Sequence, residues 1–265
     1  TNFILTKMAK EKMEFTSALT QAQNLGYAER DPTDDVEGID AAYKIAILAS
    51  LAFHTEVAPE HVYTEGITTL EAEDFEFAHE LGYEIKLLAI AERTKDGVQA
   101  RVHPALVHEE SMLAKVEGAF NAVEVYGDLA GAIVFHGLGA GPAPTTSSLI
   151  GDLLTVARSG EPAALVRSRA KLPFKPIVDL ETQYYLRVSI ADQSGVLSQI
   201  AQVFGQFDIS IATVTQKDVD NQRGTAQLVI TTHPARESAM QTALQEIKEL
   251  SVLQKVHNLL RVEPV

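Results

Sequence analysis

Hydrophobic residues recur at helical spacing near the start of the chain, and alternating or β-branched runs follow them. Helices are predicted over residues 15–25, 39–53, 71–81 and 144–158. Strands are predicted over residues 83–93, 98–107, 119–126 and 132–138. Residues 39–53 are apolar almost all round, which is typical of a buried helix. The order of helices, a strand group and a closing helix favours an α+β layer domain.

A second and more regular pattern occupies the rest of the chain. Strands are predicted over 184–191, 209–216, 224–232 and 253–261, and helices over 195–207 and 237–250. This βαββαβ order is that of the ferredoxin-like unit. Between the two patterns the chain becomes basic and prolines interrupt it, which predicts a linker or an ordered crossing strap. We therefore expect an α+β domain at 1–158, a linker at 159–182 and a ferredoxin-like domain at 183–265.

The composition narrows the classes of function. A formal net charge of -14 disfavours binding to nucleic acid, because phosphates need a basic surface. The absence of cysteine excludes disulfides, thiol nucleophiles and cysteine metal sites. No apolar run approaches the ~20 residues of a membrane span, and the first residues lack a signal-peptide pattern. We therefore expect a cytoplasmic protein with no membrane partner, and the lack of an initial Met predicts that residue 1 is not the natural start.

Six carboxylates crowd into a dozen residues just before the apolar helix. They are Glu29, Asp31, Asp34, Asp35, Glu37 and Asp40, with Arg30 as the local cation. One interpretation is helix capping, because Asp34 and Glu37 have the spacing of a capping box and acids are favoured near a helix start. The other is a functional cluster, because like charges so close together repel one another.

Asp40 and Lys44 stand four residues apart, so they share one face of the predicted helix, with the acid first in the favourable order. As an exposed pair they would contribute little. Their neighbours on the helix are mostly apolar, however, and a cation on a buried helix is costly unless it is paired or lines a cleft. Structural pairing and catalysis or ligand binding by Lys44 both remain open on these grounds.

Two possible metal sites are weak. A calcium loop would begin at Asp31, but its glycine falls at Gly38 rather than at the sixth position. The histidines make no recognised metal spacing with nearby carboxylates: His54, His61, His103 and His108. We expect no bound metal.

The run from Gly26 to Lys44, GYAERDPTDDVEGIDAAYK, resembles the signature of homoserine dehydrogenases. That signature has a glutamate, an aspartate-proline pair, an acidic pair, a glycine, an aspartate and a lysine at these spacings. Residues 1–5 (TNFIL) and 118–123 (GAFNAV) are similar to further segments of the family. The resemblance implies interconversion of L-homoserine and L-aspartate 4-semialdehyde with NAD or NADP, in threonine, methionine and isoleucine biosynthesis.

The same resemblance implies roles for individual residues. Lys44 would transfer the proton of the homoserine hydroxyl as it becomes the aldehyde, and Asp40 would orient Lys44. Glu29 would hold the substrate amino group, and Asp35 would help to bind substrate. The chemistry agrees, because an ammonium can protonate an alkoxide and nearby carboxylates set its charge and position.

A glycine-rich segment, Gly137 to Thr146, joins a predicted strand to a predicted helix, so its backbone amides could approach a ligand closely. On these residues alone a tight turn with an N-capped helix is the favoured explanation, and Pro144 stands where the dinucleotide fingerprint needs glycine. The family resemblance implies that Gly141 and Thr145 lie nearest the nicotinamide. The main nucleotide-binding domain of the family is absent from this sequence, so we expect the chain alone to be inactive.

The segment from Asp192 to Ile200 resembles the ACT-domain motif, in which an acid and a glycine shape an amino-acid pocket. The resemblance implies effector binding at Asp192 and Gly195, with threonine as the expected effector. Helix capping by Asp192 or Ser194 is the competing explanation, and Val196, Leu197 and Ile200 are expected in the core.

ACT units commonly pair side by side, so we expect a homodimer or homotetramer. The alternative function is a non-catalytic module that binds amino acids for regulation or dimerisation. The intact set of Glu29, Asp35, Asp40 and Lys44 argues against this alternative, because a pure sensor has no chemical need for it.

Overall fold

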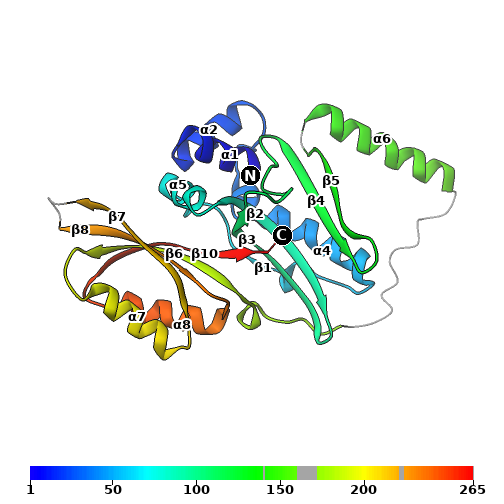
Figure 1. Cartoon of the computed structure of the whole chain (residues 1–265). Helices are drawn as coiled ribbons and strands as arrows, with labels where there is room; N and C mark the ends of the chain where they lie inside the picture. The colour runs from blue at the N-terminus through cyan, green and yellow to red at the C-terminus, as the bar shows by residue number, and fades with distance from the viewer. Residues whose placement is uncertain (140, 160–171, 221–223, 265) are drawn as a thin grey trace.

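The helices and strands follow the predicted order in the computed structural model, which describes residues 1–139, 141–159, 172–220 and 224–264 (Figure 1). The helices are α1 (Asn2–Glu11), α2 (Phe15–Asn24), α3 (Thr33–Val36), α4 (Ile39–Phe53), α5 (Ala72–Glu80), α6 (Pro142–Ser159), α7 (Val196–Gln206) and α8 (Glu237–Lys248), with short 3-10 turns η1 (Pro59–His61) and η2 (Ile177–Asp179). The strands are β1 (Tyr63–Thr64), β2 (Tyr83–Thr94), β3 (Gly97–His108), β4 (Phe120–Gly127), β5 (Gly131–Leu138), β6 (Glu181–Ala191), β7 (Ile211–Asp220), β8 (Thr225–Thr232), β9 (Ala235–Arg236) and β10 (Leu253–Glu263). The α+β class and the βαββαβ order are confirmed, whereas α1, α3 and β1 were not predicted.

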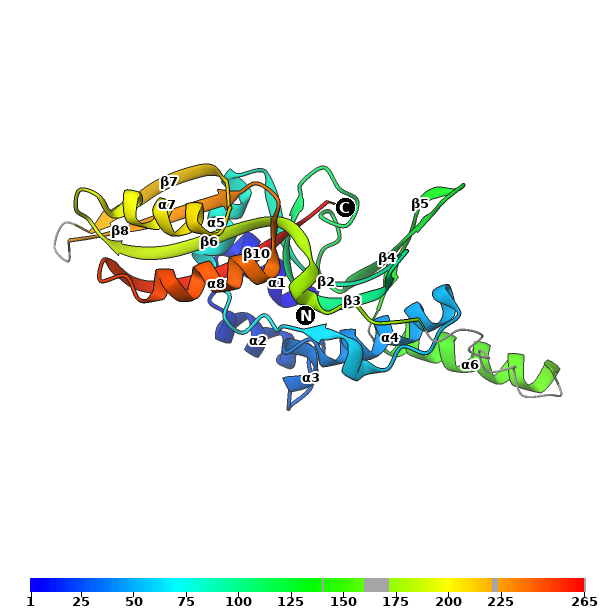
Figure 2. The same cartoon turned by 90° about the horizontal axis from the view of Figure 1, so that it is seen from below.

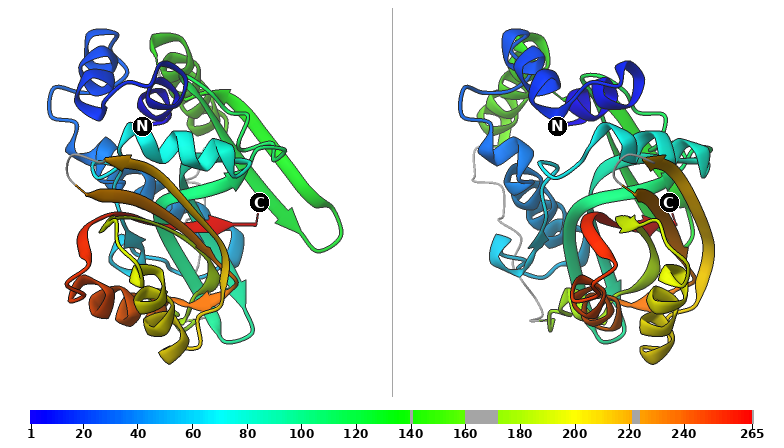
Figure 3. Two further views of the ribbon diagram at one scale, coloured as in Figure 1. Left: turned by 60° about the vertical axis from the view of Figure 1, so that its left-hand side comes forward. Right: turned by 90° about the vertical axis from the view of Figure 1, so that its left-hand side faces the viewer.

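One mixed sheet runs through both parts of the chain, in the order β1-β3-β10-β6-β8-β7, with β2 added beside β3. The end of β10 pairs in parallel with β3, in the register Arg261 with Ala105 and Glu263 with Val107. Figure 3 shows this last strand, in red, running beside the strands of the first part. The two parts are therefore joined by backbone hydrogen bonds as well as by the connection between them, whose residues 160–171 lie outside the described part of the chain.

Alternate residues of β6 serve two different cores. Leu186 and Val188 face α7 and α8, in a cluster with Phe204 and Met240. Tyr185 faces the other way, into a cluster formed with α1, α2 and α5. Because side chains alternate between the faces of a strand, the ferredoxin-like part carries its own helices on one face and the first part on the other (Figure 1).

A buried ion cluster also joins the two parts. The Arg187 side chain on β6 donates from Nε to Asp74 Oδ1 and from Nη2 to Glu71 Oε2, each at 2.6 Å. The side chains of Arg187 and Asp74 are both 0% exposed. A buried charge is costly unless it is paired, so these contacts hold α5 against the sheet.

The predicted full burial of the helix at 39–53 is wrong. Ala42, Ala46 and Ala49 of α4 pack in the core, and their small side chains permit a close approach to the strands. The opposite face is exposed, with Ile47 at 62% and Leu51 at 50%. Among the described residues nothing covers this apolar face, which a local pattern cannot reveal.

Two further elements expose apolar faces. The hairpin of β4 and β5 projects from the sheet, and α6 lies at the end of the molecule opposite α7 and α8 (Figure 2). Their exposed apolar side chains include Val123, Val125, Ile133, Phe135, Leu149, Ile150, Leu153, Leu154 and Val156. In the described part of the chain, no helix is long and apolar enough to cross a membrane.

Candidate active site

Gly38 precedes α4, and both its backbone conformation and its close neighbours require glycine at this position. Gly38 has φ 78, a left-handed conformation that side chains disfavour. A Cβ atom there would lie 3.0 Å from a methyl of Val102 on β3. Gly38 therefore lets the acidic segment turn tightly against the sheet, and α4 begins at the next residue.

Asp40 and Lys44 form the contact that their spacing predicts. The distance from Lys44 Nζ to Asp40 Oδ2 is 2.5 Å. The side chains are 69% exposed for Lys44 and 47% for Asp40, so the pair is open to solvent rather than enclosed. The ammonium is thus oriented by a carboxylate and free to meet a ligand, although an exposed pair adds little to stability.

Asp35 lies at the same end of the molecule as this pair. It belongs to α3, and its backbone carbonyl accepts a hydrogen bond of 2.7 Å from the Thr1 hydroxyl. Its helix α3 contacts α4, so Asp35 lies in a segment that packs against the helix carrying Asp40 and Lys44.

Glu29 lies in the exposed loop between α2 and α3. Its backbone carbonyl accepts a hydrogen bond of 3.0 Å from Gln23 Nε2, which shapes the loop. Among the described residues, no hydrogen bond or ion pair joins its carboxylate to Asp35 or Lys44. The structure thus leaves Glu29 near the acidic segment in sequence without a direct contact to the pair.

The capping interpretation of Asp34 and Glu37 is wrong, because α4 begins at Ile39 and its N-cap residue, Gly38, has no side-chain cap bond. Glu37 Oε1 instead accepts a hydrogen bond of 3.1 Å from the Thr68 hydroxyl. The turn is closed by Asp31, whose Oδ1 accepts from the backbone N–H and hydroxyl of Thr33, and these bonds lower the pKa of Asp31. Within the described ranges, the histidines and acids form no group of three that could hold a metal.

The glycine loop leads into α6. Gly141 has φ 113, and its carbonyl accepts bonds from the backbone N–H and the hydroxyl of Thr145, at 3.3 and 2.9 Å. Thr145 thus closes the first turn of its own helix. The described hydrogen bonds do not link Gly141 or Thr145 to the pair on α4.

In the ferredoxin-like part, Asp192 follows β6 and Gly195 precedes α7. Asp192 Oδ1 accepts a bond of 3.3 Å from Gln216 Nε2, and Gly195 has φ 87. Neither Asp192 nor Ser194 caps α7, because its N-cap residue is Gly195 and makes no side-chain bond. Leu197 is 44% exposed, so its predicted core position is wrong, whereas Val196 and Ile200 are buried.

Sequence reasoning missed the buried arginines, which hold the two parts together. Arg101, Arg187 and Arg261 are each at most 2% exposed. All three stand inside runs rich in β-branched and apolar residues, and that position is the signal that could have found them. Their carboxylate partners come from distant segments, which the sequence does not indicate.

The fold and the site together define a class of protein. It has a mixed α/β unit with a solvent-exposed pair of Asp40 and Lys44 on helix α4, joined to a ferredoxin-like unit. The family model described as homoserine dehydrogenase matches residues 1–154, and the one described as ACT domain matches residues 184–252. The chain belongs to the homoserine dehydrogenase family and carries an ACT domain.

Homoserine dehydrogenases from several bacteria are similar in sequence to nearly the whole chain. The homoserine dehydrogenase of Mycobacterium tuberculosis is 46% identical over 274 residues, and that of Helicobacter pylori is 41% identical over 263 residues; each alignment covers 99% of this chain and 62% of the relative. The crystal structure of a homoserine dehydrogenase from Thiobacillus denitrificans is 38% identical with a TM-score of 0.89, over 99% of this chain and 61% of that one. The chain thus spans about three fifths of the length of these relatives.

Proposed function

We propose that this chain supplies the substrate-binding and proton-transfer part of an enzyme that interconverts L-homoserine and L-aspartate 4-semialdehyde with NAD or NADP. The observation that carries this proposal is the open pair of Lys44 and Asp40, 2.5 Å apart, on the helix α4 that contacts the helix of Asp35, α3. Oxidation of an alcohol to an aldehyde removes a proton from the hydroxyl and a hydride from the adjacent carbon. The cofactor, when bound, accepts that hydride.

The residues of this chain would handle the proton and the charges of the substrate. Lys44 accepts the hydroxyl proton during oxidation and returns it to the alkoxide during reduction. Asp40 orients Lys44, because its carboxylate accepts a hydrogen bond of 2.5 Å from Lys44 Nζ. Glu29 and Asp35 supply negative charge for the substrate ammonium, with Glu29 in direct contact. A biosynthetic role of this kind would place the protein in the cytoplasm.

The glycine loop is proposed to face one end of the cofactor. A Cβ atom on Gly137 would meet nothing within 4 Å, so this backbone is open to a ligand. Pro142 and Pro144 have no N–H and the Thr145 N–H bonds the Gly141 carbonyl, so Ala143 supplies the N–H at the start of α6. We place Gly141 and Thr145 against the nicotinamide end. The described residues offer no fingerprint for the remaining nucleotide, so the exposed apolar face of α6 is proposed to pack on a nucleotide-binding unit, without which this chain is inactive.

Turnover with and without a nucleotide-binding unit tests this function. The 265-residue chain alone should show no NAD(P)-dependent oxidation of homoserine, and fusion to the remaining region of the Mycobacterium tuberculosis relative should restore it. In the fusion, Lys44→Met should lower kcat by about 100-fold or more with an unchanged Tm. Lys10→Met is the matched control, because Lys10 pairs with Glu117 at 2.5 Å and is 58% exposed. An active isolated chain, or an active Lys44→Met fusion, contradicts the proposal.

The ACT domain is proposed to bind threonine at Asp192 and Gly195 and to report it to the catalytic part. Gly195 has φ 87 and open space around it, which suits close approach by a ligand. Calorimetry should detect threonine binding at millimolar concentrations, and Asp192→Asn should weaken it. Threonine binding without any homoserine binding would favour the alternative, a non-catalytic regulatory module.

A second copy of the chain is the proposed partner, in a homodimer or homotetramer. The hairpin supports this proposal, because Val123 pairs with Phe135 and Val125 with Ile133, and all four are exposed on one face. An isolated two-stranded hairpin is marginal in water without a further surface to cover it. Light scattering should report an oligomer, and Phe135→Asp should reduce its mass; an unchanged mass would remove the hairpin from the interface.

A further inference from the structure

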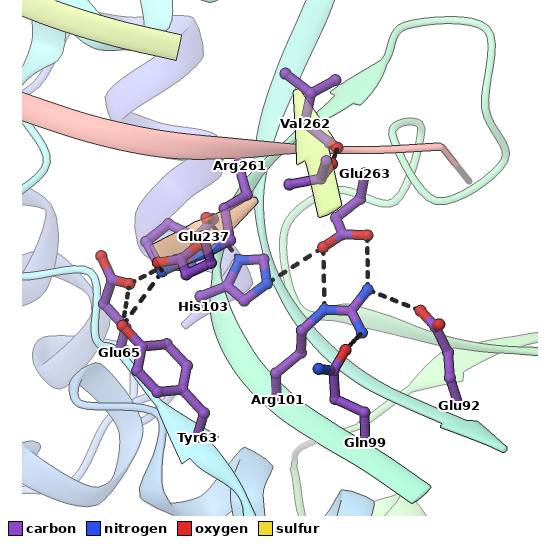
Figure 4. A network of polar contacts seen from close by, with 12 residues as sticks. Tyr63, Glu65, Glu92, Gln99, Arg101, His103, Glu237, Arg261, Val262 and Glu263 are labelled. Atoms are coloured by element: carbon purple, nitrogen blue, oxygen red, sulfur yellow. Dashed lines mark hydrogen bonds and ion pairs between the residues drawn. The ribbon is translucent and has the colours of Figure 1, made fainter. Parts of the chain in front are cut away.

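The contact between Arg261 and Glu65 joins β10 to the segment that follows β1 (Figure 4). That segment in turn contacts the acidic residues before α4. Arg261 lies on β10, where the strand has entered the sheet of the catalytic part beside β3. Its guanidinium donates from Nη1 to Glu65 Oε2 at 2.8 Å and from Nη2 to Glu237 Oε1 at 2.5 Å. Glu237 is the first residue of α8 in the ACT domain, so the Arg261 side chain binds residues of both parts of the chain.

Burial and hydrogen bonds hold the Arg261 guanidinium in one position beside Glu237. Its side chain is 3% exposed and that of Glu237 is 2% exposed. Burial alone would raise the pKa of Glu237, but the bonds from Arg261 hold it below its usual value. Tyr63 completes the group: its hydroxyl donates to Glu65 Oε2 at 3.1 Å, and its ring lies under the guanidinium. The Glu65 side chain is 34% exposed and lies at the edge of this network, whose buried members are all bonded and so resist displacement.

Glu65 is followed at once by a segment that touches the acidic residues. A Cβ atom on Gly66 would lie 2.6 Å from the Val36 carbonyl and from Glu37 Oε2, so the two backbones are in close contact. The Ile67 amide donates to the Val36 carbonyl at 2.8 Å. A displacement of Glu65 is therefore transmitted to residues 36 and 37 through these backbone contacts.

The same contact continues into the proposed catalytic helix. A Cβ atom on Gly38 would lie 3.5 Å from the Glu65 carbonyl and 3.3 Å from a methyl of Thr64. Gly38 precedes α4, which carries Asp40 and Lys44. The path from the ACT strand to the pair is thus Arg261, Glu65, the turn at Gly38, and α4.

We propose that Arg261 and Glu65 are positioning residues: through Glu65 and the turn at Gly38, the ACT strand β10 sets the placement of Asp35, Asp40 and Lys44. They touch neither substrate nor reacting atoms. This inference rests on the proposed function for its effect on homoserine, but not for the mechanical link itself. Removing the charge of Glu65 weakens its contact with β10, leaving the bonds of β10 to Tyr63 and Thr69 on either side, and the acidic segment loosens with it.

Hydrogen exchange on the 265-residue chain tests the link without any ligand. Glu65→Gln should speed amide exchange of residues 33–45 by about tenfold, because the ion pair with Arg261 is reduced to a weaker bond with a neutral amide. Glu92→Gln is the matched control: Glu92 accepts from Arg101 Nη2 at 2.8 Å in the neighbouring cluster, but it lies on β2. No change in residues 33–45 for Glu65→Gln, or an equal change for Glu92→Gln, overturns the proposal.

Two further measurements complete the test. If Glu65→Gln fails to fold, Tyr63→Phe removes the hydroxyl that donates to Glu65 at 3.1 Å and accepts from Arg261 Nη2 at 3.3 Å, and it should produce a smaller increase in the same peptide. Calorimetry should show homoserine binding weakened in the variants that loosen residues 33–45 and unchanged in Glu92→Gln. If the unaltered chain binds no homoserine, the proposed function fails, while the exchange data still decide the link.

Discussion

Replacing Asp74 by Asn should destabilise the protein strongly, because it removes one charge of a fully buried pair. Asp74 accepts from Arg187 at 2.6 and 3.1 Å and from Asn258 at 2.5 Å, and both ionic side chains are 0% exposed. Removing one partner of a buried ion pair costs about 3–5 kcal/mol. Arg187 would keep Glu71, at 2.6 Å, so we expect the low end, about 3 kcal/mol.

Urea unfolding measures this loss, since a change of midpoint at constant slope reports stability. For a chain of this size about 3 kcal/mol corresponds to a fall in Tm of roughly 6–12 °C. Glu76→Gln is the matched control on the same helix, because Glu76 pairs with Lys12 at 2.6 Å with 45% and 71% exposure. It should cost about 0–1 kcal/mol. A loss below about 1 kcal/mol for Asp74→Asn, or equal losses for both variants, would refute the reasoning.

Two further predictions concern Glu71 and Gly66. Although burial opposes it, hydrogen bonds from Lys255, Arg187 and His257 lower the pKa of Glu71 from 4.5 to about 2, so its stabilising effect is complete above pH 4.5 and is lost as the pH falls toward 2. The urea midpoint of Glu71→Gln should therefore vary less with pH in that window than that of the unaltered protein, and equal slopes would contradict this. Gly66→Ala should cost about 1–3 kcal/mol, because the new methyl meets backbone at 2.6 Å. Gly205→Ala, in open space on α7, should leave the free energy of unfolding equal or higher. Equal changes of stability in the two variants would show that the backbone beside Gly66 moves to accommodate a methyl group.

Local patterns sufficed wherever the physical cause was local. The bounds of α4 and the contact of Asp40 with Lys44 follow from helical periodicity and four-residue spacing, both of which act within one or two turns. The ferredoxin-like order likewise follows from short runs and turns. The acidic segment and its lysine were therefore found from the sequence alone.

The partners of the buried charges required the tertiary structure. Arg261 meets Glu65 across 196 positions of sequence, and Arg187 meets Asp74 across 113. No spacing rule covers such distances, because they depend on β10 pairing with β3. The exposed face of α4 has the same origin: its residues are apolar, but burial depends on whether another surface covers them. The sequence determined most of the helices and strands and the contact of Asp40 with Lys44, while tertiary packing decided that the two parts share one sheet and which charges join them.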